Sequence, residues 1–176
     1  MTNIGILGGG QLAMMMTESA IKMGLNVYVL EPTKDCPATK VGATQMSGSF
    51  KNRTDIYTFI EKYNINVLTY DIESVDAETL IEIQDKSNIN IEIHPNPKIL
   101  RVIQNKWTQK EFYVKNSLPT PNYYPVDIWR PKYENGIVLK TKYGGYDGKG
   151  VWCMNSSEEF SSIITNSGFP LSQFYF

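Results

Sequence analysis

The start of the chain carries a strand, glycine turn and helix pattern that strongly limits the possible folds. Asn3 to Leu7 is a short apolar run, Gly8-Gly9-Gly10 follows it, and a helical pattern then extends to Gly24. The apolar residues of that helical pattern are Leu12, Met15, Met16, Ala20 and Met23. A helix of this pattern directly after a strand and a glycine turn is expected in the opening unit of a parallel α/β sheet.

The patterns that follow fit the same sheet. The expected elements are strands at Val27–Leu30 and Val67–Tyr70, helices around Ile56–Tyr63 and over Asp76–Lys86, and an edge strand that carries Ile89, Ile91 and Ile93. Strand and helix alternate in this way up to residue 95. The sequence therefore predicts a Rossmann-like α/β domain with a parallel sheet over residues 1–95.

A stretch with several prolines separates this domain from a second unit. Asn96 is expected to cap a helix whose first residue is Pro97, and Trp107–Asn116 is expected to be helical. Leu118–Pro131 contains four prolines and is predicted to be an extended linker. We expect a helical connection and linker over residues 96–131, and a small α+β subdomain over residues 132–176. In that subdomain a Ser156–Glu159 pair should cap the last helix.

The second unit contains the pattern that most directly indicates chemistry. Ile137–Leu139 leads into a glycine-rich loop, and Val151–Met154 follows it, as in a hairpin of two strands. The loop glycines are Gly144, Gly145, Gly148 and Gly150, and the lysines around them are Lys140, Lys142 and Lys149. Glycines let backbone N–H groups approach an anion closely. The loop therefore favours nucleotide phosphates, and the alternative is a tight hairpin with solvated lysines.

The first glycine turn is a second candidate phosphate site. Gly8 to Ala13 matches the G-x-G-x-x-G/A pattern between a strand and a helix, whose N-terminus attracts anions. Glu31 ends the next strand, where a ribose-binding carboxylate would stand. A nicotinamide-dependent oxidoreductase with NAD(P) would use this turn, but it would give the second glycine loop no function. A nucleotide-dependent ligase would use both. A third possibility is a packing turn without a ligand.

Composition and charge exclude several classes of function. The formal net charge is -1, so no excess of basic residues indicates nucleic acid as a partner. No apolar run approaches the roughly 18 residues of a membrane span, and the N-terminus lacks the features of a signal peptide. Cys36 and Cys153 do not have metal-ligand spacing, and His94 is the only histidine. We expect a cytoplasmic protein that binds neither nucleic acid nor membrane.

Several motifs together resemble a known family. They are Gly8-Gly9-Gly10-Gln11-Leu12, Lys22-Met23-Gly24, Val29-Leu30-Glu31-Pro32, Thr69-Tyr70-Asp71-Ile72-Glu73, the helix from Gln104 to Lys110, and the loop from Val138 to Gly150. In this order they resemble N5-carboxyaminoimidazole ribonucleotide synthase, the ATP-grasp enzyme of purine biosynthesis. The resemblance implies a pre-ATP-grasp domain followed by the first subdomain of an ATP-grasp fold. It also implies ATP-dependent carboxylation of aminoimidazole ribonucleotide with bicarbonate, through carboxyphosphate.

The resemblance also implies site residues. Those implied for ATP are Lys106, Lys140, Gly144, Gly145, Tyr146, Asp147, Gly148, Lys149 and Gly150. Those implied for the ribonucleotide are Gly9, Gly10, Gln11, Leu12 and Glu73. The family implies Mg²⁺ as well, but no residue of this chain matches its metal ligands, and no catalytic residue is assigned.

The chain departs from the family in three places that matter. Lys106 stands where the family has arginine, which keeps the charge and loses the bidentate fork. Asp71 stands where the family commonly has glutamate. The chain stops at Phe176, before the half that carries the family's magnesium carboxylates, so the alternative is a non-catalytic module that binds a nucleotide or a partner. We also expect an unpaired strand edge from Leu171 onward, which could form a homo-oligomer.

Overall fold

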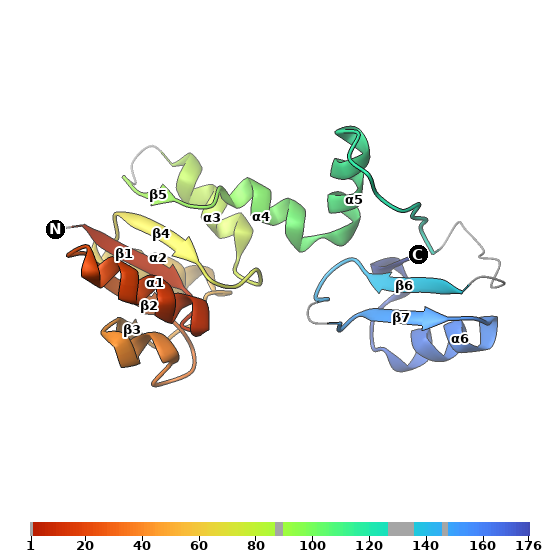
Figure 1. Cartoon of the computed structure of the whole chain (residues 1–176), viewed down its shortest axis with the longest axis horizontal. Helices are drawn as coiled ribbons and strands as arrows, with labels where there is room; N and C mark the ends of the chain where they lie inside the picture. The colour runs from red at the N-terminus through yellow and green to blue at the C-terminus, as the bar shows by residue number, and fades with distance from the viewer. Residues whose placement is uncertain (1, 87–89, 127–135, 146–147) are drawn as a thin grey trace. The chain divides into compact units, whose positions relative to one another are not determined.

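The computed structural model describes residues 2–86, 90–126, 136–145 and 148–176. It divides the chain into two compact units, residues 1–101 and residues 102–176 (Figure 1). Each unit has its own sheet and its own buried cluster. No helix in the described ranges has the length and apolar character that a bilayer span requires.

The first unit is a five-stranded parallel sheet in the order β3-β2-β1-β4-β5. Its strands are β1 (Asn3–Leu7), β2 (Asn26–Leu30), β3 (Thr44–Met46), β4 (Val67–Tyr70) and β5 (Glu92–Ile93). Its helices are α1 (Gln11–Lys22), the 3-10 helix η1 (Pro37–Val41), α2 (Arg53–Tyr63) and α3 (Ala77–Asp85). The chain moves outward from β1 to β3 and then crosses to β4 on the other side of β1. The carboxyl ends of β1 and β4 therefore flank the position where α/β sheets bind ligands.

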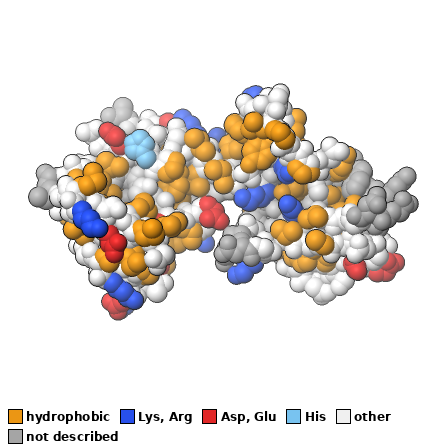
Figure 2. All heavy atoms as spheres, in the orientation of Figure 1, with side chains coloured by type: hydrophobic (Ala, Val, Ile, Leu, Met, Phe, Trp, Pro, Cys, Tyr) orange, Lys and Arg blue, Asp and Glu red, His pale blue; other side chains and the backbone are white. Residues whose placement is uncertain are grey.

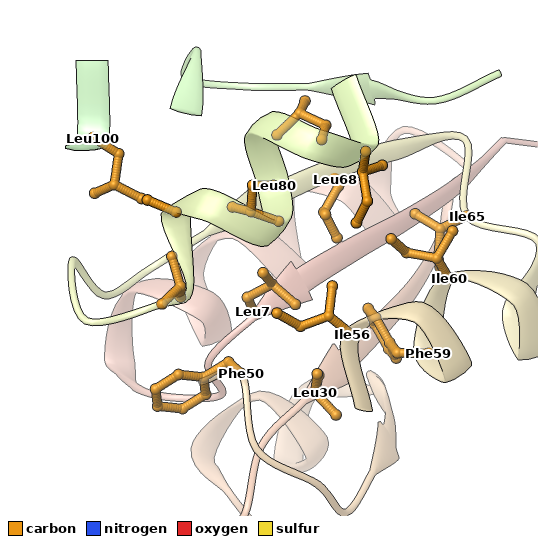
Figure 3. Packing of buried hydrophobic residues seen from close by; sticks show 14 residues of the cluster. Leu7, Leu30, Phe50, Ile56, Phe59, Ile60, Ile65, Leu68, Leu80 and Leu100 are labelled. Atoms are coloured by element: carbon orange, nitrogen blue, oxygen red, sulfur yellow. The ribbon is translucent and has the colours of Figure 1, made fainter. Parts of the chain in front are cut away.

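Both faces of this sheet are covered. Leu7 and Leu30 belong to a cluster with α2 and α3, which Figure 3 shows, whereas Ile6 and Val29 belong to a second cluster with Ala13 of α1. Neighbouring strand residues point to opposite faces, so the two clusters lie on the two sides of the sheet. This arrangement explains why the strands read as continuous apolar runs. The α/β fold predicted for this part is confirmed.

Two elements of the first unit differ from the prediction. β3 was not predicted, because it has only three residues and Gln45 at its centre gives no apolar run. It is held by parallel pairing with β2, and a local sequence pattern does not reveal such a pairing. The predicted edge strand is confirmed as β5, but only Glu92 and Ile93 pair with β4. Ile89 lies outside the described residues.

The second unit is a three-stranded antiparallel sheet in the order β7-β6-β8. Its strands are β6 (Ile137–Thr141), β7 (Val151–Met154) and β8 (Phe174–Tyr175), and its helices are α5 (Lys106–Lys115), α6 (Ser157–Asn166) and the 3-10 helix at Leu171–Gln173. The buried cluster contains Val126, Leu139, Met154 and Phe174. The predicted hairpin around the glycine loop is confirmed.

Side-chain caps begin several helices. α4 (Pro97–Gln104) begins at the predicted Pro97, where the Asn96 Oδ1 accepts the Lys98 N–H at 2.9 Å. In α6 the Ser156 Oγ accepts the Glu159 N–H at 3.2 Å, as predicted. The Glu159 carboxylate accepts the Asn155 N–H at 2.7 Å, one residue earlier than in a regular capping box.

The predicted unpaired edge at the end of the chain is wrong. Leu171 begins a 3-10 helix, and the strand itself begins at Phe174. One side of β8 pairs with β6. On its other side Tyr124 and Phe176 exchange two backbone hydrogen bonds, of 3.2 and 3.0 Å, and Pro125 bridges to Tyr175. The predicted linker thus supplies the missing partner, and the edge gives no reason to expect an oligomer.

Candidate functional site

The N-terminal glycine turn is closed by a carboxylate from a neighbouring strand. Asp71 directly follows β4, and its Oδ2 accepts the N–H of Gly10 at 2.9 Å and that of Ala13 at 3.3 Å. The backbone N–H of Asp71 donates to the Leu7 carbonyl at 3.1 Å, which fixes its position beside β1. Asp71 therefore caps α1 from outside the helix, in the place where a bound phosphate would otherwise accept these N–H groups.

Glu31 occupies a further donor of the same turn. Its Oε2 accepts the N–H of Gly9 at 3.1 Å, and its Oε1 accepts that of Thr33 at 3.0 Å. Met14 begins the regular helical bonds by donating to the Gly10 carbonyl at 3.0 Å. Among the described residues, no acceptor is assigned to the remaining first-turn amides, those of Gln11 and Leu12. These two amides are the donors that the turn can offer to a ligand.

The glycines of this turn allow close contact with the protein's own side chains. A Cβ placed on Gly8 would lie 1.7 Å from Oδ1 of Asp71, and one on Gly9 would lie 2.5 Å from Sγ of Cys36. Gly8 also has a positive φ of 102°. Packing alone thus explains why these two positions require glycine, so the glycine pattern is not in itself a sign of a dinucleotide.

The charge at this turn is unfavourable for a pyrophosphate group. Burial raises the pKa of Asp71, the N–H groups of Gly10 and Ala13 lower it in part, and the negative charge of Glu31 raises it further. Two carboxyl groups therefore stand where a dinucleotide would bring its own negative charge. They are better suited to accept hydrogen bonds from hydroxyl or amino groups.

A groove of about 570 Å³ lies beside the same turn, lined by Leu12, Met15, Met16, Ser19, Ala20, Met23, Tyr70 and Asp71. Leu12 and Met23 are 58% and 74% exposed. Figure 2 shows exposed hydrophobic side chains on this unit. The buried residues of α1 are Ala13 and Thr17, because only small side chains fit where the helix passes close to the sheet.

The predicted ribonucleotide residues are only partly brought together. Gly9, Gly10, Gln11 and Leu12 form the turn and the first turn of α1, with Gln11 and Leu12 exposed. Glu73 lies three residues beyond the end of β4 and is exposed, whereas Asp71 is the carboxylate in contact with the turn.

In the second unit, the start of α5 is joined to the end of β6. The N–H of Lys106 donates to the Lys142 carbonyl at 2.7 Å, and the Asn105 side-chain amide donates to the Tyr143 hydroxyl at 2.8 Å. Asn105 also caps α5 by accepting the N–H of Trp107 at 2.9 Å. These contacts place Lys106 beside the strand that carries Lys140 and leads into the glycine loop.

Aromatic rings fill the space between α5 and the sheet. The Trp107 ring lies 4.8 Å from that of Tyr123 and 5.9 Å from that of Tyr175, measured between centroids. The Lys142 Nζ lies 5.4 Å from the centre of the Trp107 ring, a cation–π distance. Tyr175 is the register partner of Lys140. Trp107 is half-buried in this aromatic group and does not belong to the buried cluster of the second unit.

The glycine loop folds back over β6. Gly150 has a φ of +73°, and a Cβ there would lie 2.3 Å from the Thr141 Oγ1. A Cβ on Gly145 would lie 2.9 Å from the Lys149 carbonyl oxygen. Gly144 and Gly148 have positive φ and open space around them. Their backbone conformation, and not a close contact, is therefore what favours glycine there. Tyr146 and Asp147, predicted as ATP residues, lie outside the described residues.

Four lysines near the loop have no acidic partner among the described residues. Lys106, Lys110, Lys140 and Lys142 make no ion pair with any carboxylate in the part of the chain that the structure describes. Burial, and then the positive charge of Lys140, lowers the pKa of Lys110. Within the same described residues, no group of three His, Cys, Asp or Glu side chains could hold a metal ion. The arrangement favours an anionic ligand.

Three functional candidates were missed by sequence reasoning. Asp71 was noted only as a departure from the family, Trp107 was placed only in a predicted helix, and Lys110 was not selected. The spacing of Lys106 and Lys110, four residues apart in a predicted helix, was a usable signal for one lysine face. Nothing local indicated the contact of Asp71 with Gly10, which lie 61 residues apart.

The chain resembles several known proteins in sequence and in fold. N5-carboxyaminoimidazole ribonucleotide synthase of Staphylococcus haemolyticus is 31% identical over 180 residues, which cover 97% of this chain and 46% of that protein. The carboxyaminoimidazole ribonucleotide synthase of Aspergillus clavatus, complexed with ATP, has a TM-score of 0.82 at 29% identity over 99% of this chain and 46% of that chain. An Aspergillus clavatus structure with ADP and 5-aminoimidazole ribonucleotide has a TM-score of 0.79 at 26% identity, with coverages of 99% and 45%.

The family is identified by its N-terminal part. The chain spans less than half the length of the relatives it matches, and it corresponds to their N-terminal portion. The model of the ribonucleotide synthetase preATP-grasp domain matches residues 1–104, which is more than half of the chain. The protein therefore belongs to the ribonucleotide synthetase preATP-grasp family.

Proposed function

We propose that this chain supplies the ATP-phosphate loop and part of the ribonucleotide site for ATP-dependent carboxylation of 5-aminoimidazole ribonucleotide. In this reaction a bicarbonate oxygen attacks the γ-phosphorus of ATP, and ADP leaves. The amine of the ribonucleotide then attacks the carboxyl carbon of carboxyphosphate, and inorganic phosphate leaves. The observation that carries the proposal is the hydrogen bond from the Lys106 N–H to the Lys142 carbonyl, which brings Lys106 beside the strand that carries Lys140 and leads into the glycine loop. It is supported by the similarity to proteins crystallised with ATP, ADP and this ribonucleotide.

The ATP phosphates would be held in the second unit. Lys106 and Lys140 would balance their charge, and the backbone of the glycine loop would follow them closely. The loop residues assigned to this role are Gly144, Gly145, Tyr146, Asp147, Gly148, Lys149 and Gly150, with Tyr146 and Asp147 assigned from the sequence alone. Transfer of a phosphoryl group depends mainly on positioning and on such cationic stabilisation.

The ribonucleotide would contact the first glycine turn through its uncharged groups. Asp71 and Glu31 already accept the N–H groups of Gly10 and Gly9, and their charge would repel a phosphate. Hydroxyl or amino groups of the ribonucleotide would instead donate to these carboxylates. The amides of Gln11 and Leu12, which have no assigned acceptor among the described residues, would complete these contacts together with Glu73.

Magnesium has no assigned place in this chain. The family implies Mg²⁺, which prefers carboxylate and phosphate oxygens. The described residues do not contain a cluster of His, Cys, Asp or Glu side chains that could hold it.

Equilibrium binding to the purified chain tests the proposal against its competitors. We expect ATP and 5-aminoimidazole ribonucleotide to bind separately and NAD not to bind, because two carboxyl groups occupy the turn that a dinucleotide would need. Asp71→Asn should weaken binding of the ribonucleotide and leave binding of ATP unchanged. Tight NAD binding, or a folded chain that binds neither proposed ligand, would contradict the proposal. Phosphate release in the presence of all three substrates would separate a catalytic chain from a binding module.

A further inference from the structure

One lysine of the second unit has no role in the function proposed above, although it stands on the same face of α5 as Lys106. Lys110 follows Lys106 by four residues and Trp107 by three, and residues at these spacings are neighbours on a helix. Trp107 faces the sheet, since its ring contacts that of Tyr175 and makes a cation–π contact with the Lys142 ammonium group. The face of α5 that carries Lys110 is thus the one turned toward β6 and β8.

Lys110 is fixed in place without being neutralised. It is half-buried, and its Nζ donates to the Thr120 Oγ1 at 2.7 Å. An ammonium group has three donors, so two remain for another ligand. The acid nearest in the helix, Glu111, is exposed and accepts the Trp107 Nε1–H at 2.8 Å. Among the described residues Lys110 has no carboxylate partner.

The charge of Lys140 also acts on Lys110. The positive charge of Lys140 contributes, after burial, to lowering the pKa of Lys110, so the two ammonium groups lie within electrostatic reach of each other. Lys110 and Lys140 are both half-buried, and neither has an acidic partner among the described residues, so their charges repel each other in the free protein. A ligand with several negative charges would remove that repulsion, and a singly charged ligand would remove little of it.

We propose that Lys110 is a further phosphate-binding residue, which with Lys106, Lys140 and Lys142 forms one cationic site for the polyphosphate of a nucleoside triphosphate. This inference rests on the proposed function and extends its ATP site to a residue and a helix face outside the glycine loop. Its alternative is a purely structural lysine that ties α5 to the segment around Thr120.

Two variants separate these roles. Lys110→Met removes both the charge and the hydrogen bond to Thr120, whereas Thr120→Val removes only the hydrogen bond and keeps the charge. Binding of ATP, ADP and AMP to the full chain is measured by tryptophan fluorescence. Thermal unfolding of each variant is measured in parallel. Lys115→Met, at the exposed end of α5, serves as the control for general loss of a lysine.

We expect Lys110→Met to weaken ATP binding about tenfold, as for loss of one charge-assisted hydrogen bond, with a smaller loss for ADP and almost none for AMP. Thr120→Val and Lys115→Met should retain the wild-type ratio of ATP to AMP affinity. An equal loss for all three nucleotides, or the same loss in Thr120→Val, would overturn the inference and assign Lys110 a structural role. Unchanged ATP affinity in Lys110→Met would overturn this inference alone, whereas absence of ATP binding in the wild type would overturn the proposed function as well.

Discussion

The Asp71 carboxylate, at the end of β4, accepts the backbone N–H of Gly10, at the start of α1, at 2.9 Å. This bond joins the two strand ends that flank the ligand-binding position of the sheet. The protein thus places its own negative charge where the glycine pattern, read alone, predicts a phosphate. The distinction between a dinucleotide enzyme and a ribonucleotide ligase depends on this contact.

The charge of Asp71 should oppose folding near neutral pH. Because the folded protein raises the pKa of Asp71 above its ordinary value of 3.8, folding favours the protonated form. The contribution of this group to stability should therefore increase as the pH falls through the raised pKa toward 3.8. Urea unfolding of the wild type and Asp71→Asn at several pH values between about 7 and 4 measures this. A difference between the two proteins that does not vary with pH would contradict it.

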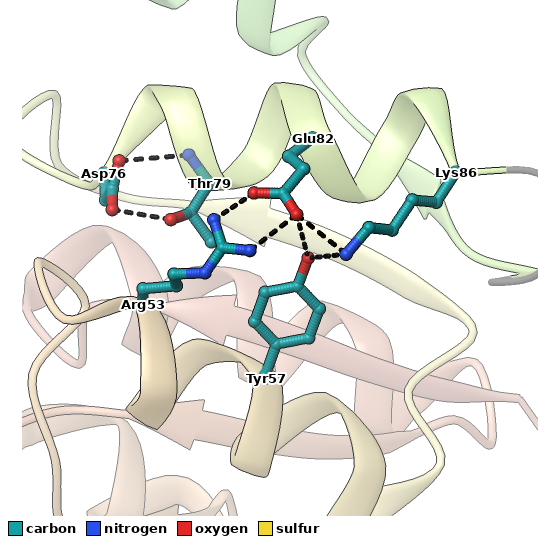
Figure 4. A network of polar contacts seen from close by, with 6 residues as sticks. All are labelled: Arg53, Tyr57, Asp76, Thr79, Glu82 and Lys86. Carbon is teal, nitrogen blue, oxygen red and sulfur yellow. Dashed lines mark hydrogen bonds and ion pairs between the residues drawn. The ribbon is translucent and has the colours of Figure 1, made fainter.

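The contact between α2 and α3 should have the opposite pH dependence. Arg53 and then Lys86 lower the pKa of Glu82 from 4.5 to about 2, and Tyr57 donates to the same carboxylate at 3.3 Å (Figure 4). Since the folded pKa is depressed, this stability is present above pH 4.5 and is lost as the pH falls toward about 2. Glu82→Gln should remove that acid dependence.

The matched control for this network is Glu61→Gln in α2, because Glu61 makes no ion pair in the described residues. Acid unfolding should be unchanged in this control. The Glu82 effect should also shrink in high salt, because the groups are partly exposed and therefore screened. Equal acid sensitivity of both variants would refute the assignment.

Thr141 and Thr79 form a matched pair of buried hydroxyl groups. The Thr79 hydroxyl donates to the Asp76 Oδ2 at 2.6 Å, whereas the Thr141 hydroxyl is buried with no partner among the described residues. Thr141→Val should therefore stabilise the second unit, by about 1 kcal/mol, and Thr79→Val should destabilise the first by a similar amount. The tryptophans all lie beyond residue 101, so their fluorescence reports the second unit. Hydrogen exchange reports the first. Destabilisation by Thr141→Val would reveal a partner for its hydroxyl.

The glycine loop should tolerate substitution very unequally. Gly148→Ala meets only the strain of a positive φ, which costs about 1 kcal/mol. Gly150→Ala meets the same strain and also places a Cβ 2.3 Å from the Thr141 Oγ1. Chemical unfolding followed by tryptophan fluorescence should show the larger loss for Gly150→Ala. Thr141→Ala in the same chain should restore part of it, and equal losses in the two single variants would contradict the close contact.

Local patterns in the sequence account for much of the fold. The strands β1, β4 and β7, and the caps at Asn96 and Ser156, follow from apolar runs and capping residues that lie close together in the chain. Long-range contacts account for the failures. β3 depends on its pairing with β2, and the cap of α1 comes from Asp71. Leu12 and Met23 have the spacing of a buried face, yet the close approach of α1 to the sheet selects Ala13 and Thr17 instead.

The most direct test of the account is calorimetric titration of ATP into the wild-type chain and into Lys140→Gln, with Lys115→Gln as the control. We expect the wild type and the control to bind ATP equally, and Lys140→Gln to bind it at least about tenfold more weakly while it unfolds at the same temperature. A folded wild-type chain that binds no ATP, or a Lys140→Gln variant that binds it as well as the wild type, would contradict the assignment of the glycine loop and its lysines to nucleotide phosphates.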